Sequence, residues 1–384
     1  MELTKCKLGE LITQRREKND GSDLPICGVS KDGLIPPKQK DADTSIYNVF
    51  YRDDFIFNPA RMELNSIAIN DMYDRAICSS LYEVFYVHRT DLLLPHYLEL
   101  IIRQKWFTRY CEFLGQGSAR EYCRFGNISE IEIEFPPIEE QQKIVEYNTA
   151  IENRIALKQK MNDNLVAVGT ASIQKNVGRG ALINLTEAEM DSLIFPEDFK
   201  IKTVSEFCAE TKSGSTPSRT NNEYWENGTI SWVKSGEVHN NITLQTEEYI
   251  TSLGLSESST KLLPKDTVLM AMYGVTAGEV GYLAIEATTN QAICGMICRS
   301  KAEAAYLYFS LIQSQAAISR LSNGGAQDNL SKNFIDNIKI VVPPSEFIEK
   351  LNLAAIVEQM TLNTKEITLL EELQATVLAQ LSSR

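Results

Sequence analysis

Residues that could carry out acid–base or metal chemistry are few in this sequence. Glu130, Glu132 and Glu134 alternate along a predicted strand, which places three carboxylates on one face. A metal or acid–base site is one interpretation, but the solvated face of an edge strand is preferred because carboxylates are normally exposed. None of the histidines, His88, His96 and His239, is spaced from cysteines or carboxylates in the way that metal ligands are.

Cofactor motifs are incomplete. An adenine methyltransferase needs an Asn/Asp-Pro-Pro-aromatic motif, and Asn58-Pro59-Ala60-Arg61 has only its first two residues. Ser213-Gly214-Ser215 is not followed by Gly-Lys-Ser/Thr, so it is not a nucleotide P-loop. Cys294 and Cys298 lie in a strand-like run, where packing explains them better than ligation. The sequence therefore predicts a non-catalytic chain without a cofactor or metal of its own.

Length and composition indicate an ordinary globular protein of two or more domains, with 384 residues. Eight scattered cysteines without a C-x-x-C motif predict reduced thiols in the cytoplasm. We find no signal-peptide pattern and no apolar run long enough to span a bilayer, so we expect no membrane association.

Two long helices dominate the predicted architecture. The first follows Pro136-Pro137 and runs from Ile138 to about Ile173, roughly 50 Å at 1.5 Å per residue. The second follows Pro343-Pro344 and runs from Glu346 to about Leu381. Apolar residues recur along each at nearly heptad spacing, so we expect the helices to pair. Their stripes are Ile144, Ile151, Ile155, Met161, Leu165 and Val168 in the first, and Leu353, Ile356, Met360, Ile367, Leu370, Val377 and Leu381 in the second.

Polar residues interrupt the second stripe at Asn363 and Gln374. At seam positions such residues lower stability but fix the register of the two helices. With only two helices, the flanks of each stripe would stay exposed, which favours a partner protein on this surface.

An internal repeat precedes each long helix. Residues 114–137 align without gaps on residues 321–344, and Lys7 to Leu11 corresponds to Thr203 to Phe207. Each repeat mixes short strands with helices, so the predicted fold class is α/β (α+β). In the first unit we expect strands at 48–58, 80–88 and 128–135 and a helix at 95–113. In the second we expect strands at 228–233, 267–273, 280–285, 292–299 and 335–342 and a helix at 302–321.

If the two helices pack antiparallel, two globular units separated by the helices would be related by a pseudo-two-fold axis. Such a protein can address two half-sites on duplex DNA, which lie roughly 34 Å apart for each turn of separation.

The order of these motifs resembles that of the specificity (S) subunits of type I restriction-modification systems. The second unit carries Ser213-Gly214-Ser215-Thr216-Pro217, Glu223-Tyr224-Trp225 and Gln327-Asp328-Asn329-Leu330-Ser331. Pro-Pro followed by Glu139-Glu140-Gln141-Gln142-Lys143-Ile144 is typical of the helix after a recognition domain. The resemblance covers essentially the whole chain.

This resemblance implies two target recognition domains, at 1–137 and 201–344, each reading half of a split DNA target. Spacer helices at 138–175 and 345–384 would set the gap between the halves, with 176–200 as linker and entry to the second repeat. The helices would also dock two methyltransferase (M) subunits. S-adenosylmethionine would belong to those subunits, and ATP and Mg²⁺ to restriction (R) subunits that can join the complex.

Candidate DNA-binding residues are polar side chains of loop segments, because Arg, Lys, Asn, Gln, Ser and Thr read base edges. Each could equally be an ordinary turn or cap residue. We select Lys31, Arg61, Arg120 and Arg124 in the first unit, and Ser215, Thr216, Arg219, Asn221, Lys234, Tyr273, Gln291 and Gln327 in the second.

Partner-binding candidates lie on the two helices. They are Gln141, Gln142, Ile144, Ile151, Leu353, Ile356 and Ile367. One departure is Ser345 to Lys350, which lacks the Gln-Gln of the first helix and leaves the docking contacts there less defined.

Net charge constrains this interpretation. The chain carries −13, residues 1–137 hold 17 Lys and Arg against 21 Asp and Glu, and residues 180–344 hold 12 against 19. Since duplex affinity comes largely from cations on phosphates, the chain alone should bind DNA poorly. The methyltransferase subunits would then have to supply phosphate contacts.

Two other hypotheses stay open at this point. The duplicated units could form a non-catalytic protein-binding scaffold with coiled-coil oligomerisation, which would predict no methylated split target. A nuclease or methyltransferase acting alone is a weaker hypothesis, because the cofactor and metal motifs are missing.

Overall fold

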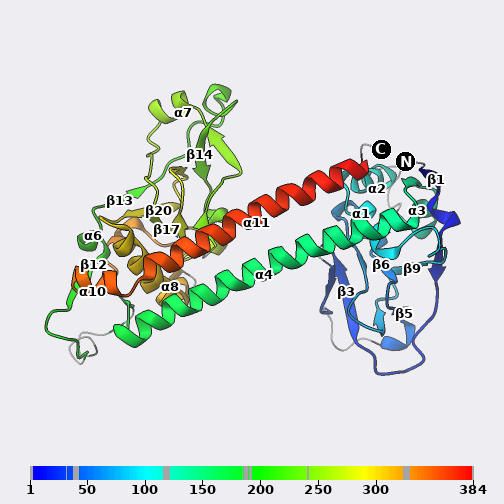
Figure 1. Cartoon of the computed structure of the whole chain (residues 1–384), viewed down its shortest axis with the longest axis horizontal. Helices are drawn as coiled ribbons and strands as arrows, with labels where there is room; N and C mark the ends of the chain where they lie inside the picture. The colour runs from blue at the N-terminus through cyan, green and yellow to red at the C-terminus, as the bar shows by residue number, and fades with distance from the viewer. Residues whose placement is uncertain are drawn as a thin grey trace. The chain divides into compact units, whose positions relative to one another are not determined.

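A computed structural model describes residues 3–31, 33–37, 43–115, 122–183, 185, 189, 193–239, 242–322 and 329–382 (Figure 1). The chain divides into two compact units. Unit 1 comprises Met1–Arg154 and Leu370–Arg384, and unit 2 comprises Ile155–Leu369. Both units mix helices and strands, so the predicted α/β class is confirmed. The described residues include no helix that is long and apolar enough to cross a membrane.

Unit 1 contains two four-stranded sheets among its described residues, in the orders β2-β9-β6-β7 and β4-β3-β8-β5. Stacked phenylalanines fill the core beside the first sheet, where the Phe55 and Phe85 rings lie 5.0 Å apart. The strands are β1 (Thr4–Lys7), β2 (Ile12–Arg15), β3 (Ile26–Ser30), β4 (Gly33–Ile35), β5 (Asn48–Tyr51), β6 (Phe55–Phe57), β7 (Ile67–Ile69), β8 (Arg75–Cys78), β9 (Glu83–Val87) and β10 (Glu132–Phe135). The helices are η1 (Leu8–Glu10), η2 (Thr44–Ile46), η3 (Pro59–Leu64), α1 (Pro95–Ile102), α2 (Lys105–Gly115) and α3 (Phe125–Ser129).

Unit 2 is built on a five-stranded sheet of order β13-β20-β17-β18-β15, with three-stranded sheets β16-β14-β19 and β11-β21-β12. Its strands are β11 (Ala181–Leu182), β12 (Lys200–Thr203), β13 (Glu210–Ser213), β14 (Ile230–Val233), β15 (Ile242–Thr243), β16 (Glu248–Ile250), β17 (Thr267–Ala271), β18 (Val280–Leu283), β19 (Thr288–Thr289), β20 (Ile293–Ile297) and β21 (Lys339–Val342). Its helices are α6 (Val204–Phe207), η4 (Asn222–Tyr224), η5 (Ser235–Glu237), α7 (Ser252–Ser256), η6 (Gly274–Thr276), α8 (Lys301–Ser322), α9 (Lys332–Asp336) and α10 (Ser345–Lys350).

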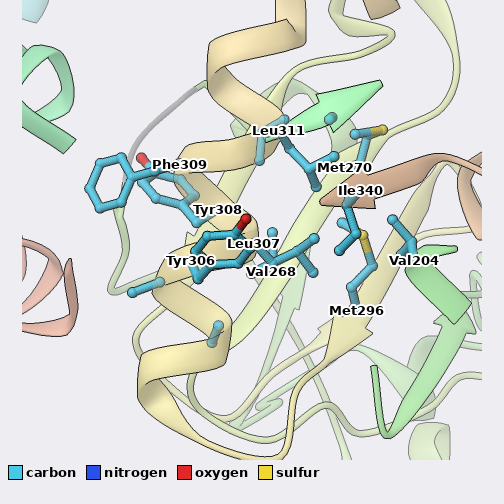
Figure 2. Packing of buried hydrophobic residues seen from close by; sticks show 14 of the residues in the cluster. Val204, Val268, Met270, Met296, Tyr306, Leu307, Tyr308, Phe309, Leu311 and Ile340 are labelled. Carbon is cyan, nitrogen blue, oxygen red and sulfur yellow. The ribbon is translucent and has the colours of Figure 1, made fainter. Parts of the chain in front are cut away.

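Helix α8 supplies the largest side chains of the unit 2 core. Tyr306, Tyr308 and Phe309 are fully buried, and Figure 2 shows α8 side chains lying beside Met270 of β17 and Ile340 of β21. The Tyr306 hydroxyl donates a hydrogen bond to the Val341 carbonyl, which satisfies its polar end inside the core.

The two sequence repeats adopt the same closing arrangement. In unit 1, β1 pairs antiparallel with β10, with Lys7 opposite Glu132. In unit 2, β12 pairs antiparallel with β21, with Thr203 opposite Lys339. The backbone repeats this match, because Leu8 N donates to Ile131 O at 2.8 Å and Val204 N donates to Ile338 O at 2.9 Å. In each unit the last strand, β10 or β21, is followed by Pro-Pro and a helix.

The long helices are α4 (Ile138–Asn176) and α11 (Leu353–Ser382), and within each unit their segments run antiparallel and side by side (Figure 1). In unit 1, Gln374 Nε2 donates to Asn148 Oδ1 at 3.0 Å. In unit 2, Lys158 Nζ lies 2.7 Å from Glu366 Oε2, and Asn363 Nδ2 donates to Asn162 Oδ1 at 2.9 Å. Asn363 is fully buried, so the predicted polar interruption of the seam is confirmed.

The seam differs from the predicted stripe on α4. Met161 and Val168 are 37% and 55% exposed, whereas Asn148 and Lys158 are buried. Met161 and Val168 each precede a residue that does face inward, Asn162 and Gly169, and one residue turns a helix by about 100°. At Gly169 the helix lies so close to α8 that an added Cβ would come within 2.3 Å of Phe309 Cε1.

Several predicted elements are divided in the structure. The strand expected at 48–58 is β5 and β6, separated by a turn with Asp53 at φ 64°. The helix expected at 95–113 breaks into α1 and α2, and the second long helix breaks at Asn352, where φ is 53°. The segments expected as strands at 128–135 and 335–342 each start inside a short helix, α3 or α9. Only their later residues, β10 and β21, are strands, and these pair with β1 and β12.

Candidate nucleic-acid interface

Of the three glutamates expected on one strand face, Glu132 and Glu134 lie on β10, whereas Glu130 is the C-cap residue of α3 because β10 begins only at Glu132. Lys5 Nζ lies 3.5 Å from Glu132 and 3.4 Å from Glu134, and Lys7 Nζ lies 2.5 Å from Glu130. All of these side chains are substantially exposed, as expected for a solvated strand face. Across the described residues, no group of three potential ligands is placed to hold a metal ion.

A polar loop of unit 2 follows β13 and packs tightly against the end of β19. An added Cβ at Gly214 would come within 2.1 Å of Thr289 Oγ1, so only glycine fits at this crossing. Ser215 N then donates to Thr289 O at 2.9 Å, and Thr216 Oγ1 donates to Gln291 Oε1 at 2.5 Å. The loop therefore brings the predicted residues Ser215, Thr216 and Gln291 together.

Two tryptophans hold the continuation of this loop. Trp232 Nε1 donates to Ser215 O at 3.1 Å, and Trp225 Nε1 donates to Ser218 O at 3.0 Å. Their rings are perpendicular with centroids 5.0 Å apart. Arg219 lies against both rings, with its Cζ 3.7 Å from the Trp225 centroid and 4.8 Å from the Trp232 centroid. These are cation–π distances.

Carboxylates neutralise the two cations of this cluster. Arg219 Nη1 donates to Glu248 Oε2, and Lys234 Nζ lies 3.3 Å from Glu248 Oε1 and also contacts Glu247. The hydrogen bond from Arg219 lowers the pKa of Glu248, and the hydrogen bond to Glu247 raises the pKa of Lys234. The cluster thus pairs two cations with two carboxylates and carries no net charge at neutral pH.

The remaining candidate DNA-binding residues of unit 2 lie outside this cluster. Asn221 caps η4, because its Oδ1 accepts from Glu223 N at 3.2 Å, so the alternative of a cap residue applies to it. Tyr273 is 40% exposed and lies beside Asn329 in an isolated β-bridge. Gln327, like Arg120 in unit 1, lies outside the described residues.

Unit 1 has a cleft of about 1170 Å³ between β3, η3, the β8–β9 turn and α2. Two predicted residues line it: Lys31, in the turn after β3, and Arg61 in η3. Exposed Leu64 and Leu81 also line the cleft, together with Arg103, which the sequence did not single out. Arg124 is not among the lining residues; its Nη1 lies 3.2 Å from Glu83 Oε1.

The predicted partner-binding residues are mostly engaged within the chain. Gln141 is fully buried, and its amide binds Leu94 N at 2.9 Å, Leu92 O at 2.7 Å and Pro136 O at 2.8 Å. Leu353 is also buried. We therefore correct these two assignments: neither side chain is accessible to a partner. Ile144, Ile151, Ile356 and Ile367 are half-buried, and Gln142 is exposed.

Other residues of the helices are apolar and exposed. Leu362, Leu369 and Leu373 of α11 are 57%, 56% and 50% exposed, and their spacing of seven and four residues places them on one face. On α4, Tyr147 is 67% exposed. The three leucines form an accessible apolar strip along α11, which we call the α11 leucine strip.

Comparison with known sequences gives two matches to one family profile. The profile of the type I restriction modification DNA specificity domain matches residues 6–167 and 196–375. Each match begins near the first strand of one repeat, β1 or β12, and includes most of the long helix that follows.

Individual relatives agree with this result. The specificity subunit of the type I restriction enzyme EcoR124I/EcoR124II of Escherichia coli is 26% identical over 51% of this chain, and the match spans 46% of that protein. The specificity subunit of the type I restriction enzyme HindI of Haemophilus influenzae is 21% identical over 76% of this chain and 77% of its own length. The chain thus spans about half of the first relative and three quarters of the second.

Among solved structures, the S subunit of a type I restriction-modification system from M. genitalium has a similar fold. The match has a TM-score of 0.58 at 15% identity and covers 99% of this chain and 96% of that one.

Proposed function

This chain belongs to the type I restriction-modification DNA specificity family, and we propose that each of its two units reads one half of a bipartite DNA target. The observation that carries this proposal is the duplication. Two family matches coincide with two repeats that share the same strand pairing, Pro-Pro segment and long helix. A repeated reading unit requires a target with two parts.

In this proposal residues 1–137 and 201–344 are the recognition domains, and residues 138–175 and 345–384 are the spacer helices, with 176–200 joining them. Unit 2 would read DNA through the loop around Ser215, Thr216 and Gln291, and through Arg219 and Lys234, with Asn221, Tyr273 and Gln327 in addition. Unit 1 would read DNA through its cleft at Lys31 and Arg61, with Arg120 and Arg124. Polar groups in loops on a packed scaffold support this assignment.

We further propose that the paired helices set the gap between half-sites and dock two methyltransferase subunits. The accessible α11 leucine strip supports a protein partner, because aligned exposed leucines favour burial against an apolar surface. The chain would be a non-catalytic cytoplasmic subunit. S-adenosylmethionine would bind to the methyltransferase, and ATP and Mg²⁺ to a restriction subunit where one joins.

The test is a methylome. The chain is co-expressed with the methyltransferase encoded beside it in a host without adenine methylation, and modified bases are read by long-read sequencing. We expect a split motif methylated on both strands that disappears when this chain is omitted. Exchange of either recognition domain for one from a relative should change one half of the motif only.

A negative result is informative when folding is controlled. If the two proteins are folded and bound to each other but no new methylation is found, the specificity function is excluded. The protein-binding scaffold would then be the better hypothesis.

A further inference from the structure

We propose that Arg219 reads a guanine in the half-site of unit 2, and that Glu248 positions it. The proposal rests on the proposed function and identifies a residue and a base within it. The observations that carry it are the contacts around the guanidinium group, its exposure and the charge balance of the cluster.

The guanidinium group is fixed on two sides. Trp225 and Trp232 restrict its plane through the ring contacts described above, and Glu248 holds Nη1. Glu248 is itself placed by strand pairing, because it lies opposite Trp232 in the antiparallel pair β14–β16. Cross-strand partners point to the same face of a sheet, so the fold brings tryptophan and carboxylate to one guanidinium group.

The opposite edge of the guanidinium group is available to a ligand. Within the part of the chain that the structure describes, Nε and Nη2 of Arg219 have no hydrogen-bond partner. The Arg219 side chain is 49% exposed. Two parallel N–H donors of a fixed guanidinium group match O6 and N7 of guanine in the major groove, the commonest specific contact to a base.

The charge balance favours a base over a phosphate. Arg219 and Lys234 are matched by Glu247 and Glu248, so the cluster provides little net attraction for the DNA backbone. A phosphate site would instead carry excess positive charge. Rigid orientation without net charge suits recognition of a neutral base edge.

The test compares methylomes of the co-expressed complex containing the wild-type chain, Arg219→Ala, Arg219→Lys, Glu248→Gln and Glu248→Asp. The half of the motif read by unit 2 is first identified by domain exchange. We expect it to contain one guanine that Arg219→Ala relaxes, with discrimination at that position reduced about 10- to 100-fold. Arg219→Lys should relax the same position, because lysine lacks the planar fork.

Glu248 is tested by its effect on the same base. Glu248→Gln should relax this position, and Glu248→Asp should restore part of the preference. Lys265→Ala, which removes another exposed cation of unit 2, is the matched control and should leave the motif unchanged. Circular dichroism of each purified complex shows whether it is folded, and the two Glu248 variants and Arg219→Lys decide the question if Arg219→Ala does not fold.

Three results would overturn the proposal. Loss of methylation that is uniform across sites, without relaxation at any one position of the motif, would identify a phosphate contact instead. An unchanged motif in folded variants would show a purely structural cluster. A half-site without any G·C pair would exclude guanine recognition. In each case the wild-type split motif would still establish the proposed function, whereas its absence would refute that function separately.

Discussion

The Gln141 amide forms three hydrogen bonds inside unit 1, although its residue type and position on a helix suggested a partner contact. Replacement by leucine would leave the Leu94 N–H and the Leu92 and Pro136 carbonyls without their partner. We expect Gln141→Leu to lower the free energy of unfolding by about 3 kcal/mol, because unsatisfied buried polar groups are costly.

The neighbouring exposed residue provides the control. Gln142→Leu should change stability by no more than about 0.5 kcal/mol. Urea titration of the intact chain measures both variants, and equal effects would refute the assigned role of Gln141.

His96 offers a test of electrostatics in unit 1. Its Nδ1 lies 3.7 Å from Glu99 Oε2 and its Nε2 lies 3.7 Å from Asp53 Oδ1, and the nearby Glu99 carboxylate raises the pKa of His96 above 6.5. A pKa raised on folding adds stability that is complete below the unfolded pKa and is lost as pH rises through the folded one. Stability contributed by His96 should therefore fall as pH increases above about 6.5.

An NMR titration of the histidine ring signals checks this directly. Glu99→Gln should lower the pKa of His96, whereas Glu349→Gln, which alters an exposed residue of unit 2, should not. A His96 pKa that does not respond to Glu99→Gln would show that the two side chains do not interact.

For individual residues, the sequence predicted which side chains lie at the candidate site better than it predicted the contacts they make. Readout chemistry in loop segments predicts Arg219, Lys234, Ser215, Thr216 and Gln291, and the structure brings these residues into one region of unit 2. Their carboxylate partners were missed, because Glu248 reaches Arg219 only through the register of β14 and β16, which the sequence does not reveal. Trp225 stands in the Glu223-Tyr224-Trp225 motif and Trp232 in the strand predicted at 228–233, but the hydrogen bonds from their Nε1 atoms to the loop cannot be read from the sequence.

Among the elements, the buried polar groups between α4 and α11 explain why the helices hold one register. The Lys158 side chain is 11% exposed and binds both Glu366 and Asn363. We expect Glu366→Gln to reduce stability by about 1 kcal/mol, a modest value because the Glu366 side chain is 35% exposed and water screens the pair.

Glu358→Gln changes an exposed residue of the same helix and should have no measurable effect. Urea midpoints of the two variants and the wild type decide the matter. If Glu358→Gln is as destabilising as Glu366→Gln, the ion pair between Lys158 and Glu366 is not the cause.

The α11 leucine strip is the element predicted to meet the methyltransferase. The triple variant Leu362→Ser, Leu369→Ser and Leu373→Ser should weaken binding of that subunit at least tenfold, since each leucine would lose apolar burial of about 1.5 kcal/mol or more. Calorimetric titration with the purified methyltransferase measures the effect.

Leu253→Ser, at an exposed leucine of α7, is the control and should bind normally. The urea midpoint of the triple variant should stay close to that of the wild type. Unchanged methyltransferase affinity in the triple variant would remove the strip from the proposed docking surface.

Long periodic elements were the most predictable part of the fold. Helix α4 starts at Ile138 as the Pro-Pro signal indicates, and the paired seam with Asn363 was expected from the heptad pattern. Short elements were less predictable, because α3 and α9 span only five residues each, too few to show a periodic pattern in the sequence. The break before α11 depends on one left-handed residue, Asn352, for which no strong local signal exists.

For the whole molecule, the negative net charge predicts weak DNA binding by the isolated chain. With a net charge of −13, the isolated chain should bind duplex DNA at physiological salt with a dissociation constant no tighter than about 1 μM, the range of non-specific binding. Addition of the methyltransferase subunits should tighten binding of a duplex that carries the split target. Fluorescence anisotropy with target and scrambled duplexes measures both steps, and tight specific binding by the chain alone would contradict this prediction.

The closing strand pair of each unit has a consequence for inheritance. Because β1 bonds to β10 and β12 bonds to β21, the first and last strands of a repeat are encoded at the two borders of one gene segment and depend on each other. Recombination that carries both borders together transfers a matched closing pair of strands. A crossover between them would instead join mismatched strands. Gene exchange should therefore favour breakpoints beside the Pro-Pro codons, where a lineage can acquire a new half-target without disturbing the other.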